Sequence, residues 1–285
     1  MTQPPTSSYW AIVRRQFVRN RAAVVGLFLI FLFILAALAA PFVAPYDPNA
    51  IAPARSLQGP STAHWLGTDE LGRDVLTRVL MGARITLMIT MAAVALALLL
   101  GTILGLVSGF YGGKLDTLIM RGVDVLMSMP GFLLAIGIIA ALGVGTTNVI
   151  LAVGIYSIPA FARVARGSTL SAKSEEYVTA ARAVGATGSR IIVHHLLPNI
   201  MPPLVVQTSL RLATAILTAS GLSFLGLGPQ PPTPEWGAML SAGRDYMTSA
   251  PLLVAFPGLA ILVVTLSFNL LGDGLRDSLD PRLKQ

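Results

Sequence analysis

The chain has 285 residues, of which 54% are hydrophobic and 12% charged, and its formal net charge is +7. Soluble domains carry about 25% charged residues. A surface this poor in charge, with a mean hydropathy of +0.73, excludes a purely water-facing protein. The absence of cysteine excludes disulfides and thiolate metal sites. The basic balance could suggest nucleic acid, but Lys and Arg collected in cytoplasmic loops explain it better, so we expect no nucleic-acid partner.

Apolar stretches of the length needed to cross a membrane recur along the chain. They lie at Ala22–Ala44, Ile85–Phe110, Met129–Leu142, Asn148–Ala162, Met201–Leu227 and Leu252–Leu271. The third is short, and we expect it to begin earlier, near Leu118, with a polar inner end. Each stretch must satisfy its backbone internally, so each is predicted to be a helix. The predicted fold class is an all-α, polytopic membrane protein with about six transmembrane helices.

The first stretch, Ala22–Ala44, follows basic residues, and Ala37-Leu38-Ala39 resembles a signal-peptide cleavage site. The apolar core of a signal peptide has only about 7–15 residues, however. Because this run is longer, we expect an uncleaved anchor.

A long outer segment, Pro41–Arg84, separates the first two spans, and prolines prevent a continuous helix in its first half. From Glu70 onward, apolar residues recur at helical spacing and predict an amphipathic helix that enters the second span. These residues are Leu71, Val75, Leu76 and Val79. Inside the second span, glycines repeat every four residues and predict close contact with another helix. They are Gly101, Gly105 and Gly109.

Two groups of charged residues near the spans favour structural roles. Asp69, Arg73 and Asp74 would form a salt-bridged outer cap, or would face a partner outside the membrane. Arg121 and Asp124 are spaced so that they can pair on one helix face at the membrane edge. In both groups we favour the structural alternative.

Orientation follows from the basic residues. With the N-terminus inside, 14 Lys and Arg lie in inner segments and 5 in outer ones, as the positive-inside rule requires. Both termini and Glu176–Asn199 are then predicted to be cytoplasmic. Arg211 falls within the fifth span, where a charge is costly and often functional. It is the one charge that we consider for a translocation path, with a side chain that snorkels inward as the alternative.

The segment Glu176–Asn199 is polar and basic between apolar neighbours and reads EYVTAARAVGATGSRIIVHHLLPN. Ala180 and Ala181 favour a short helix. Gly185 can supply the left-handed residue that ends it. Pro198 is expected to end any preceding helix and to redirect the chain into the fifth span. An ordinary solvated loop would explain these residues one by one, but not the spaced pattern as a whole.

That pattern resembles the EAA loop of permease subunits of ATP-binding-cassette (ABC) importers: Glu-Ala-Ala, three residues, Gly, nine residues, Ile, one residue, Leu-Pro. Thr179 stands here in place of Glu and His195 in place of Ile. The resemblance implies a coupling helix that lies in a groove of a separate ATPase and passes its motion to the spans. The implied contact residues are Glu176, Tyr177, Thr179, Ala180, Ala181, Arg182, Gly185, Ala186, Leu197 and Pro198.

Two further segments, His64–Asp74 and Gly221–Lys284, resemble the C-type permease of dipeptide, oligopeptide and nickel importers. The resemblance implies a type I permease in the inner membrane, surrounded by lipid. It also implies a second homologous permease, two ATPase subunits that bind ATP-Mg, and an extracytoplasmic solute-binding protein. Peptides, nickel complexes, glutathione and opine-like solutes are all possible cargoes of such a subunit.

We expect three regions: residues 1–82 with the tail, first span and outer segment, residues 83–275 as the permease core with its loop at 172–200, and a tail at 276–285. Asp273, Arg276 and Asp280 would contact the ATPase or form a solvated terminus. Trp236 is suited to the membrane interface.

The chain lacks a G-x-x-x-x-G-K-[ST] phosphate loop and an H-E-x-x-H pair, and His194 and His195 point apart on a helix. We therefore expect no enzyme activity, and no cofactor or metal in this chain. The alternative class is a secondary transporter driven by an ion gradient. Such folds usually show internal repeats and polar midplane residues. The sequence shows no repeat and few midplane charges.

Overall fold

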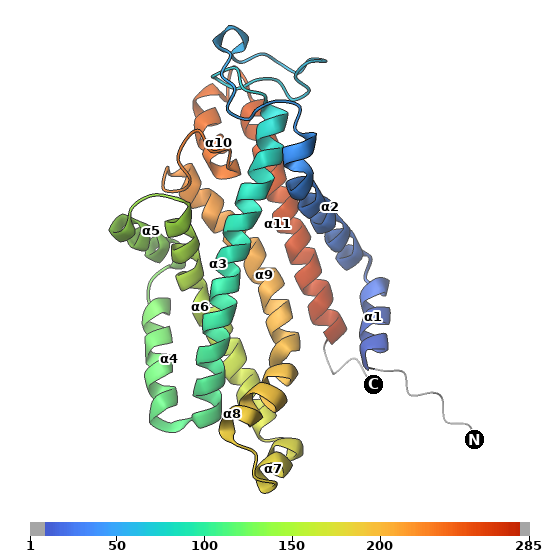
Figure 1. Ribbon diagram of the computed structural model, residues 1–285, viewed down its shortest axis with the longest axis vertical. Helices are drawn as coiled ribbons and strands as arrows, with labels where there is room; N and C mark the ends of the chain where they lie inside the picture. Colours follow the sequence, from blue (N-terminus) through green and yellow to red (C-terminus); the bar gives the residue numbers. More distant parts are fainter. Residues whose placement is uncertain (1–8, 280–285) are drawn as a thin grey trace, which may run out of the picture.

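The structure is a computed structural model that describes residues 9–279, shown in Figure 1. The helices are α1 (Tyr9–Arg19), α2 (Arg21–Val43), α3 (Val75–Tyr111), α4 (Gly113–Met127), α5 (Gly131–Leu142), α6 (Thr146–Lys173), α7 (Glu176–Ala183), α8 (Gly188–Arg190), α9 (Leu197–Phe224), α10 (Trp236–Gly243) and α11 (Leu252–Leu279). A π-helix, Ile191–Leu196, joins α8 to α9. Over residues 9–279 the chain forms no β-strand, and the all-α prediction is confirmed.

Five helical segments are long and apolar enough to cross a membrane: α2, α3, α6, the continuous segment Gly188–Phe224, and α11. The pair α4 and α5 would supply a sixth, but it is bent by 90° at its junction. The third predicted span is therefore broken rather than continuous. Pro130 stands at the break, where it lacks an N–H and disfavours the helical conformation of the preceding residue.

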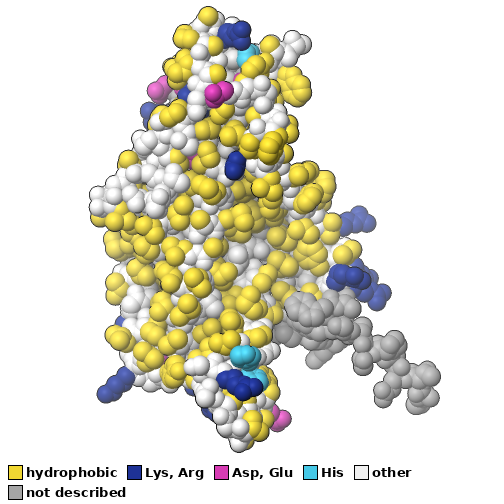
Figure 2. Space-filling model, viewed as in Figure 1, with side chains coloured by type: hydrophobic (Ala, Val, Ile, Leu, Met, Phe, Trp, Pro, Cys, Tyr) yellow, Lys and Arg dark blue, Asp and Glu magenta, His cyan; other side chains and the backbone are white. Residues whose placement is uncertain are grey.

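Figure 1 shows that α1, the end of α11, α7 and α8 lie toward one end of the molecule, which we call the loop end. The segment between α2 and α3 and the short helix α10 lie at the opposite end, which we call the cap end. In Figure 2, hydrophobic side chains cover most of the middle of the visible face, and charged side chains gather mainly toward its ends and along one edge. This distribution suits a protein whose middle faces lipid.

The helix α3 begins at Val75, later than the helix predicted from Glu70. The Asp74 carboxylate caps it by accepting the Thr77 N–H at 2.8 Å. Upstream, Gly72 has a φ of +74° and its N–H bonds the Asp69 carbonyl at 2.9 Å. This turn takes the backbone bonds that a longer helix would need, so the start predicted from apolar spacing was wrong.

The three glycines of α3 lie against α6, as predicted. A Cβ at Gly101 would stand 2.6 Å from Phe161 Cβ, and one at Gly109 would stand 2.8 Å from Thr169 Cβ. At Gly105 it would clash with the carbonyl of Ala162. Only a hydrogen atom fits at these positions, so the glycines allow α3 and α6 to pack closely along their length.

The predicted pair of Arg121 and Asp124 is wrong. Asp124 instead bonds Arg163 of α6, with 2.8 Å between Asp124 Oδ1 and Arg163 Nη2. A second carboxylate on α4, Asp116, receives Arg166 Nε and Nη2, both at 2.7 Å. The helix α6 extends well past the predicted Ala162 and presents both arginines to α4. A tertiary partner therefore replaces the neighbour on the same helix.

Pro198 does not end a helix, in contrast to the prediction. It lies near the start of α9, within the continuous segment Gly188–Phe224. The preceding π-helix bonds the Leu197 N–H to the Ile192 carbonyl, which widens the turn just before the proline. The Asn199 side chain bonds the His195 carbonyl at 2.6 Å. These bonds let the chain pass the proline without leaving the helix.

Trp236, which the sequence suited to the membrane interface, is fully buried within the protein. Its indole N–H donates to the Val79 carbonyl at 3.0 Å, and its ring lies over Gly82 of α3. The neighbouring Glu235 is also buried and caps α10 by accepting the Ala238 N–H at 2.9 Å. The cause is the placement of α10 against α3, α9 and α11, which hydropathy does not reveal.

Candidate functional site

The helix α7, Glu176–Ala183, forms where the sequence predicts a short helix. Glu176 stands in its first turn and Arg182 in its last, so both charges favour the helix dipole. Ala180 and Ala181 supply helix propensity in between. In Figure 1, α7 projects beyond the ends of the long helices.

The end of α7 is a Schellman motif. Gly185 has a φ of +82°, the Ala186 N–H bonds the Ala181 carbonyl at 3.0 Å, and the Gly185 N–H bonds the Arg182 carbonyl at 2.9 Å. The predicted left-handed conformation of Gly185 is confirmed. A Cβ at this position would meet nothing within 4 Å. Glycine is therefore required here by backbone conformation and not by crowding within the chain.

One face of α7 is bound to the rest of the molecule and the other is free. Val178 and Ala181 are buried in the main apolar core. Thr179 and Ala180 are exposed, and Val184 is 85% exposed. The two alanines of the motif therefore differ: Ala181 packs inward, while Ala180 belongs to a surface that a partner can reach.

The ring of Phe110, at the end of α3, connects this loop to the bundle. Lys173 Nζ lies 5.7 Å from its centroid and the Arg182 guanidinium carbon 5.6 Å, both in the range of cation–π contacts. Lys173 Nζ also donates to the Phe110 carbonyl at 2.5 Å. A Cβ at Gly188 would lie 3.2 Å from the same ring. Sequence reasoning missed Phe110 because nothing marks it beyond its place at the end of an apolar run.

The remaining loop residues lie at differing depths. Ala186 and Leu197 are partly buried against the core. Pro198 is exposed at the start of α9. Tyr177 is 38% exposed, and its ring lies 6.4 Å from that of His195. Desolvation and the nearby Glu175 raise the pKa of Tyr177, so its hydroxyl remains a hydrogen-bond donor at neutral pH.

Arg211 lies half-buried near the middle of α9, as its position in the fifth span predicted. Its guanidinium forms no ion pair and no side-chain hydrogen bond with any residue in the range 9–279. The predicted contact residues of α7 and Arg211 are therefore at separate places, one at the loop end and one within the bundle.

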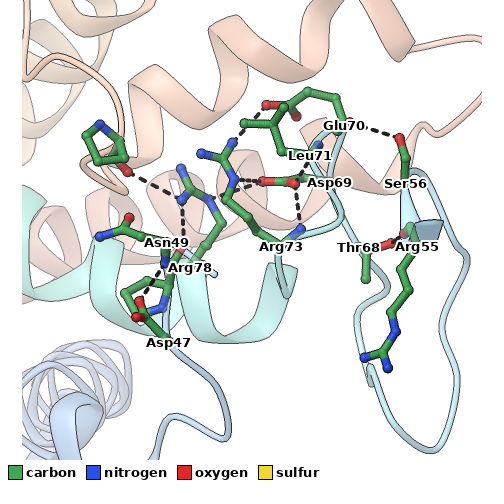
Figure 3. Close-up of polar contacts among 12 residues, drawn as sticks. Asp47, Asn49, Arg55, Ser56, Thr68, Asp69, Glu70, Leu71, Arg73 and Arg78 are labelled. Carbon is green, nitrogen blue, oxygen red and sulfur yellow. Dashed lines mark hydrogen bonds and ion pairs between the residues drawn. The ribbon is translucent and has the colours of Figure 1, made fainter. Parts of the chain in front are cut away.

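At the cap end, a buried ion network confirms the predicted pairing of Asp69 with Arg73, whereas the predicted inclusion of Asp74 is wrong (Figure 3). Arg73 bonds Asp69 at 2.6 Å and Glu70 at 2.8 Å. Arg78 lies 3.4 Å from Asp69 and donates to the Pro48 carbonyl at 2.8 Å. Asp74 does not join this network. It caps α3 and lies 2.9 Å from His64 Nδ1.

Beyond the last span, Asp273 and Arg276 are exposed on the final turns of α11. Asp277, for which the sequence predicted no role, accepts a hydrogen bond from the Asn20 side chain at 3.5 Å. This bond connects α11 to the start of α2. Asp280, predicted with them, lies outside the described residues.

Known proteins resemble this chain along nearly its whole length. A relative from Alkalihalophilus pseudofirmus, "Dipeptide transport system permease protein DppC", is 46% identical, covering 99% of this chain and 94% of the relative. "Glutathione transport system permease protein GsiD" from Pectobacterium atrosepticum is 48% identical, covering 98% and 92%. The same protein from Escherichia coli O157:H7 is 49% identical, covering 98% and 91%.

A solved structure, an inward-facing conformation of the MetNI methionine ABC transporter, shares the fold with a TM-score of 0.58 at 19% identity, covering 72% of this chain and 98% of that one. The family "N-terminal TM domain of oligopeptide transport permease C" matches residues 8–60. The family "Binding-protein-dependent transport system inner membrane component" matches residues 101–285. The resemblance read from the loop and its flanks is confirmed: the chain is a multi-pass inner-membrane permease and belongs to the family of binding-protein-dependent transport system inner membrane components.

Proposed function

We propose that this chain forms half of the translocation pathway of an ABC importer and that α7 couples it to separate ATPase subunits. The observation that carries the proposal is the division of α7 into a face bound to the core and an exposed face. Val178 and Ala181 join the apolar core, whereas Thr179, Ala180 and Val184 are open to a partner. A helix held in this way can receive a displacement at one face and pass it on through the other.

The proposed orientation places both termini and the loop end in the cytosol. The 14-to-5 distribution of basic residues supports it. The arrangement in Figure 1 agrees, because α1, the end of α11 and α7 lie toward the same end. An ATPase in the cytosol would then meet the exposed face of α7.

The proposed assembly contains a second homologous permease, two ATPases that bind ATP-Mg, and an extracytoplasmic solute-binding protein. ATP hydrolysis belongs to the partners, because this chain lacks a phosphate-binding loop. The names of the relatives favour a dipeptide or glutathione as solute. Nickel complexes and opine-like solutes are the alternatives within the same family.

The function is tested by transport in membrane vesicles that contain the full complex. Uptake should require ATP and should stop when the ATPase subunits carry an inactivated phosphate loop, while a protonophore leaves it unchanged. The reverse pattern would identify a secondary transporter and refute the proposal. The isolated chain should show no saturable ATP binding.

The orientation is tested separately with single cysteines, which the wild-type chain lacks. An impermeant thiol reagent should label Ser61→Cys in intact cells and should leave Ser189→Cys unlabelled until the cells are opened. The opposite labelling would reverse the topology without affecting the assignment of the fold.

A further inference from the structure

One face of α9 carries a line of polar side chains. Gln207, Arg211, Thr214 and Thr218 are spaced by four, three and four residues, which places them along one side of the helix. We propose that this polar stripe lines the solute path and that Arg211 binds a carboxylate of the solute as it passes. The inference rests on the proposed import function and adds to it a ligand class and a binding residue.

The chain itself does not cover the stripe. Thr214 is exposed, and the other three members are half-buried. Beside the stripe, Leu210 contacts Gly272 of α11, where a Cβ would stand 2.7 Å from Leu210 Cδ2. At one end of it, Phe132 of α5 lies 3.2 Å from the position of a Cβ at Gly221. The opposite side of α9 is buried against the bundle. The stripe is therefore open between the contacts with α11 and α5.

The open face of α2 is chemically different. On α2, the exposed large side chains include Leu27, Phe28, Phe31, Leu35 and Leu38, as expected for contact with lipid. Polar and charged side chains at membrane depth normally face a bundle interior or water. The contrast indicates that the α9 stripe faces a wet space in the assembled transporter rather than acyl chains.

The charge of the stripe selects the ligand. Arg163 and Arg166 of α6 each bond a carboxylate of α4, at 2.8 Å and 2.7 Å. Arg211 has no such partner over the range 9–279. A guanidinium binds a carboxylate through two parallel hydrogen bonds. Dipeptides and glutathione, the solutes in the relatives' names, both carry free carboxylates.

The threonines of the stripe play a different part. The Thr214 hydroxyl bonds the Arg211 carbonyl at 3.0 Å, and the Thr218 hydroxyl bonds the Thr214 carbonyl at 2.9 Å. Their donors are thus already used within the helix. The threonines therefore provide a polar surface that binds a solute only weakly. Arg211 is the one charged group of the four.

The first experiment measures water access in the assembled transporter. Thr214→Cys and Thr218→Cys are compared with Leu99→Cys, which replaces an exposed leucine on α3. A charged thiol reagent should modify both stripe positions and leave Leu99→Cys unmodified. Equal reactivity of Thr214→Cys and Leu99→Cys would overturn the wet path.

The second experiment measures uptake of one dipeptide and of its C-terminal amide by complexes with Arg211→Gln, Arg211→Lys and, as control, Arg84→Gln, another arginine on a long apolar helix. The affinity of the binding protein for each peptide is measured separately, so that differences belong to the membrane step. Arg211→Gln should reduce uptake of the free acid by about 10- to 100-fold, the worth of a charge-assisted hydrogen bond. Uptake of the amide should change little, and Arg211→Lys should retain part of the activity.

Three outcomes would overturn the carboxylate site: unchanged uptake in Arg211→Gln, an equal loss for acid and amide, or loss of the second permease from the complex. The last would show that Arg211 pairs with that subunit. Wild-type uptake that does not depend on the ATPase would instead refute the proposed function, whatever the Arg211 variants do.

Discussion

At the cap end, Asp69, Arg73 and Arg78 are buried, and both arginines lie within ion-pair distance of Asp69. At the loop end, Glu176 and Arg182 are exposed to solvent. The cap therefore satisfies its charges within one chain. The loop leaves polar groups and an apolar side chain, Val184, without cover. The difference indicates that the cap stabilises the fold of this chain, whereas the proposed role of the loop is contact with another protein.

The largest expected effect is from Asp69→Asn at the cap. The change leaves Arg73 and Arg78 buried without their shared carboxylate, and breaking a buried ion pair costs about 3–5 kcal/mol. Thermal unfolding of the detergent-purified protein should shift to clearly lower temperature. The matched control is Asp245→Asn, which removes an exposed pair with Arg244 worth about 0–1 kcal/mol. Equal shifts for both variants would mean that the cap is not a stabilising network.

Gly185→Val should separate stability from coupling at the loop end. A β-branched residue at a φ of +82° is strained by roughly 1–3 kcal/mol. We expect a normal membrane level but greatly reduced uptake, because α7 can no longer end in its present turn. Gly167→Val is the control, since that glycine of α6 also has open space around its Cβ position but an ordinary helical φ. Normal uptake in Gly185→Val would show that the turn is not needed for coupling.

Ala180→Glu tests the exposed face of α7 alone. It should leave unfolding of the isolated subunit unchanged, because Ala180 is exposed there. Yet it should lower the amount of co-purifying ATPase by about tenfold, the effect of roughly 1.4 kcal/mol of lost affinity. Thr179→Ala, the adjacent exposed residue, should be nearly silent. If Ala180→Glu leaves the ATPase ratio unchanged, the exposed face of α7 is not the contact surface.

The smallest effect concerns Glu235, a buried carboxyl at the cap end without a cationic partner within the described residues. Burial raises its pKa above the ordinary value of 4.5, so the folded state holds the proton more tightly than the unfolded one. Stability from this group is thus fullest below pH 4.5 and falls as pH rises toward the raised pKa. Glu235→Gln should flatten that decline in unfolding temperature. An unchanged slope would mean that Glu235 does not titrate in this window.

Local signals predicted much of the fold and of the loop. The apolar runs, the glycine spacing of α3 and the turn at Gly185 depend on neighbours in sequence, and they are confirmed except for the third run, which is broken. The pairing of Asp124 with Arg163, the burial of Trp236 and the contacts of Phe110 depend on which helices meet in space. Periodicity and hydropathy contain no information on such partners. Pro130 could have predicted the break, because proline disfavours a continuing helix. It lies inside an apolar run, however, and the run alone indicated one continuous span.

The helix α3 has 37 residues, a length of about 55 Å at the usual rise per residue. Its first residue follows the Asp74 cap, and its last turn holds Phe110 beside α7. The glycine contact with α6 stiffens the stretch between. In the proposed transporter, this single helix would join the outer cap to the loop that meets the ATPase, and would link their binding equilibria. By reciprocity, an outer partner that changes the affinity of the ATPase for α7 must have its own affinity changed by the same factor.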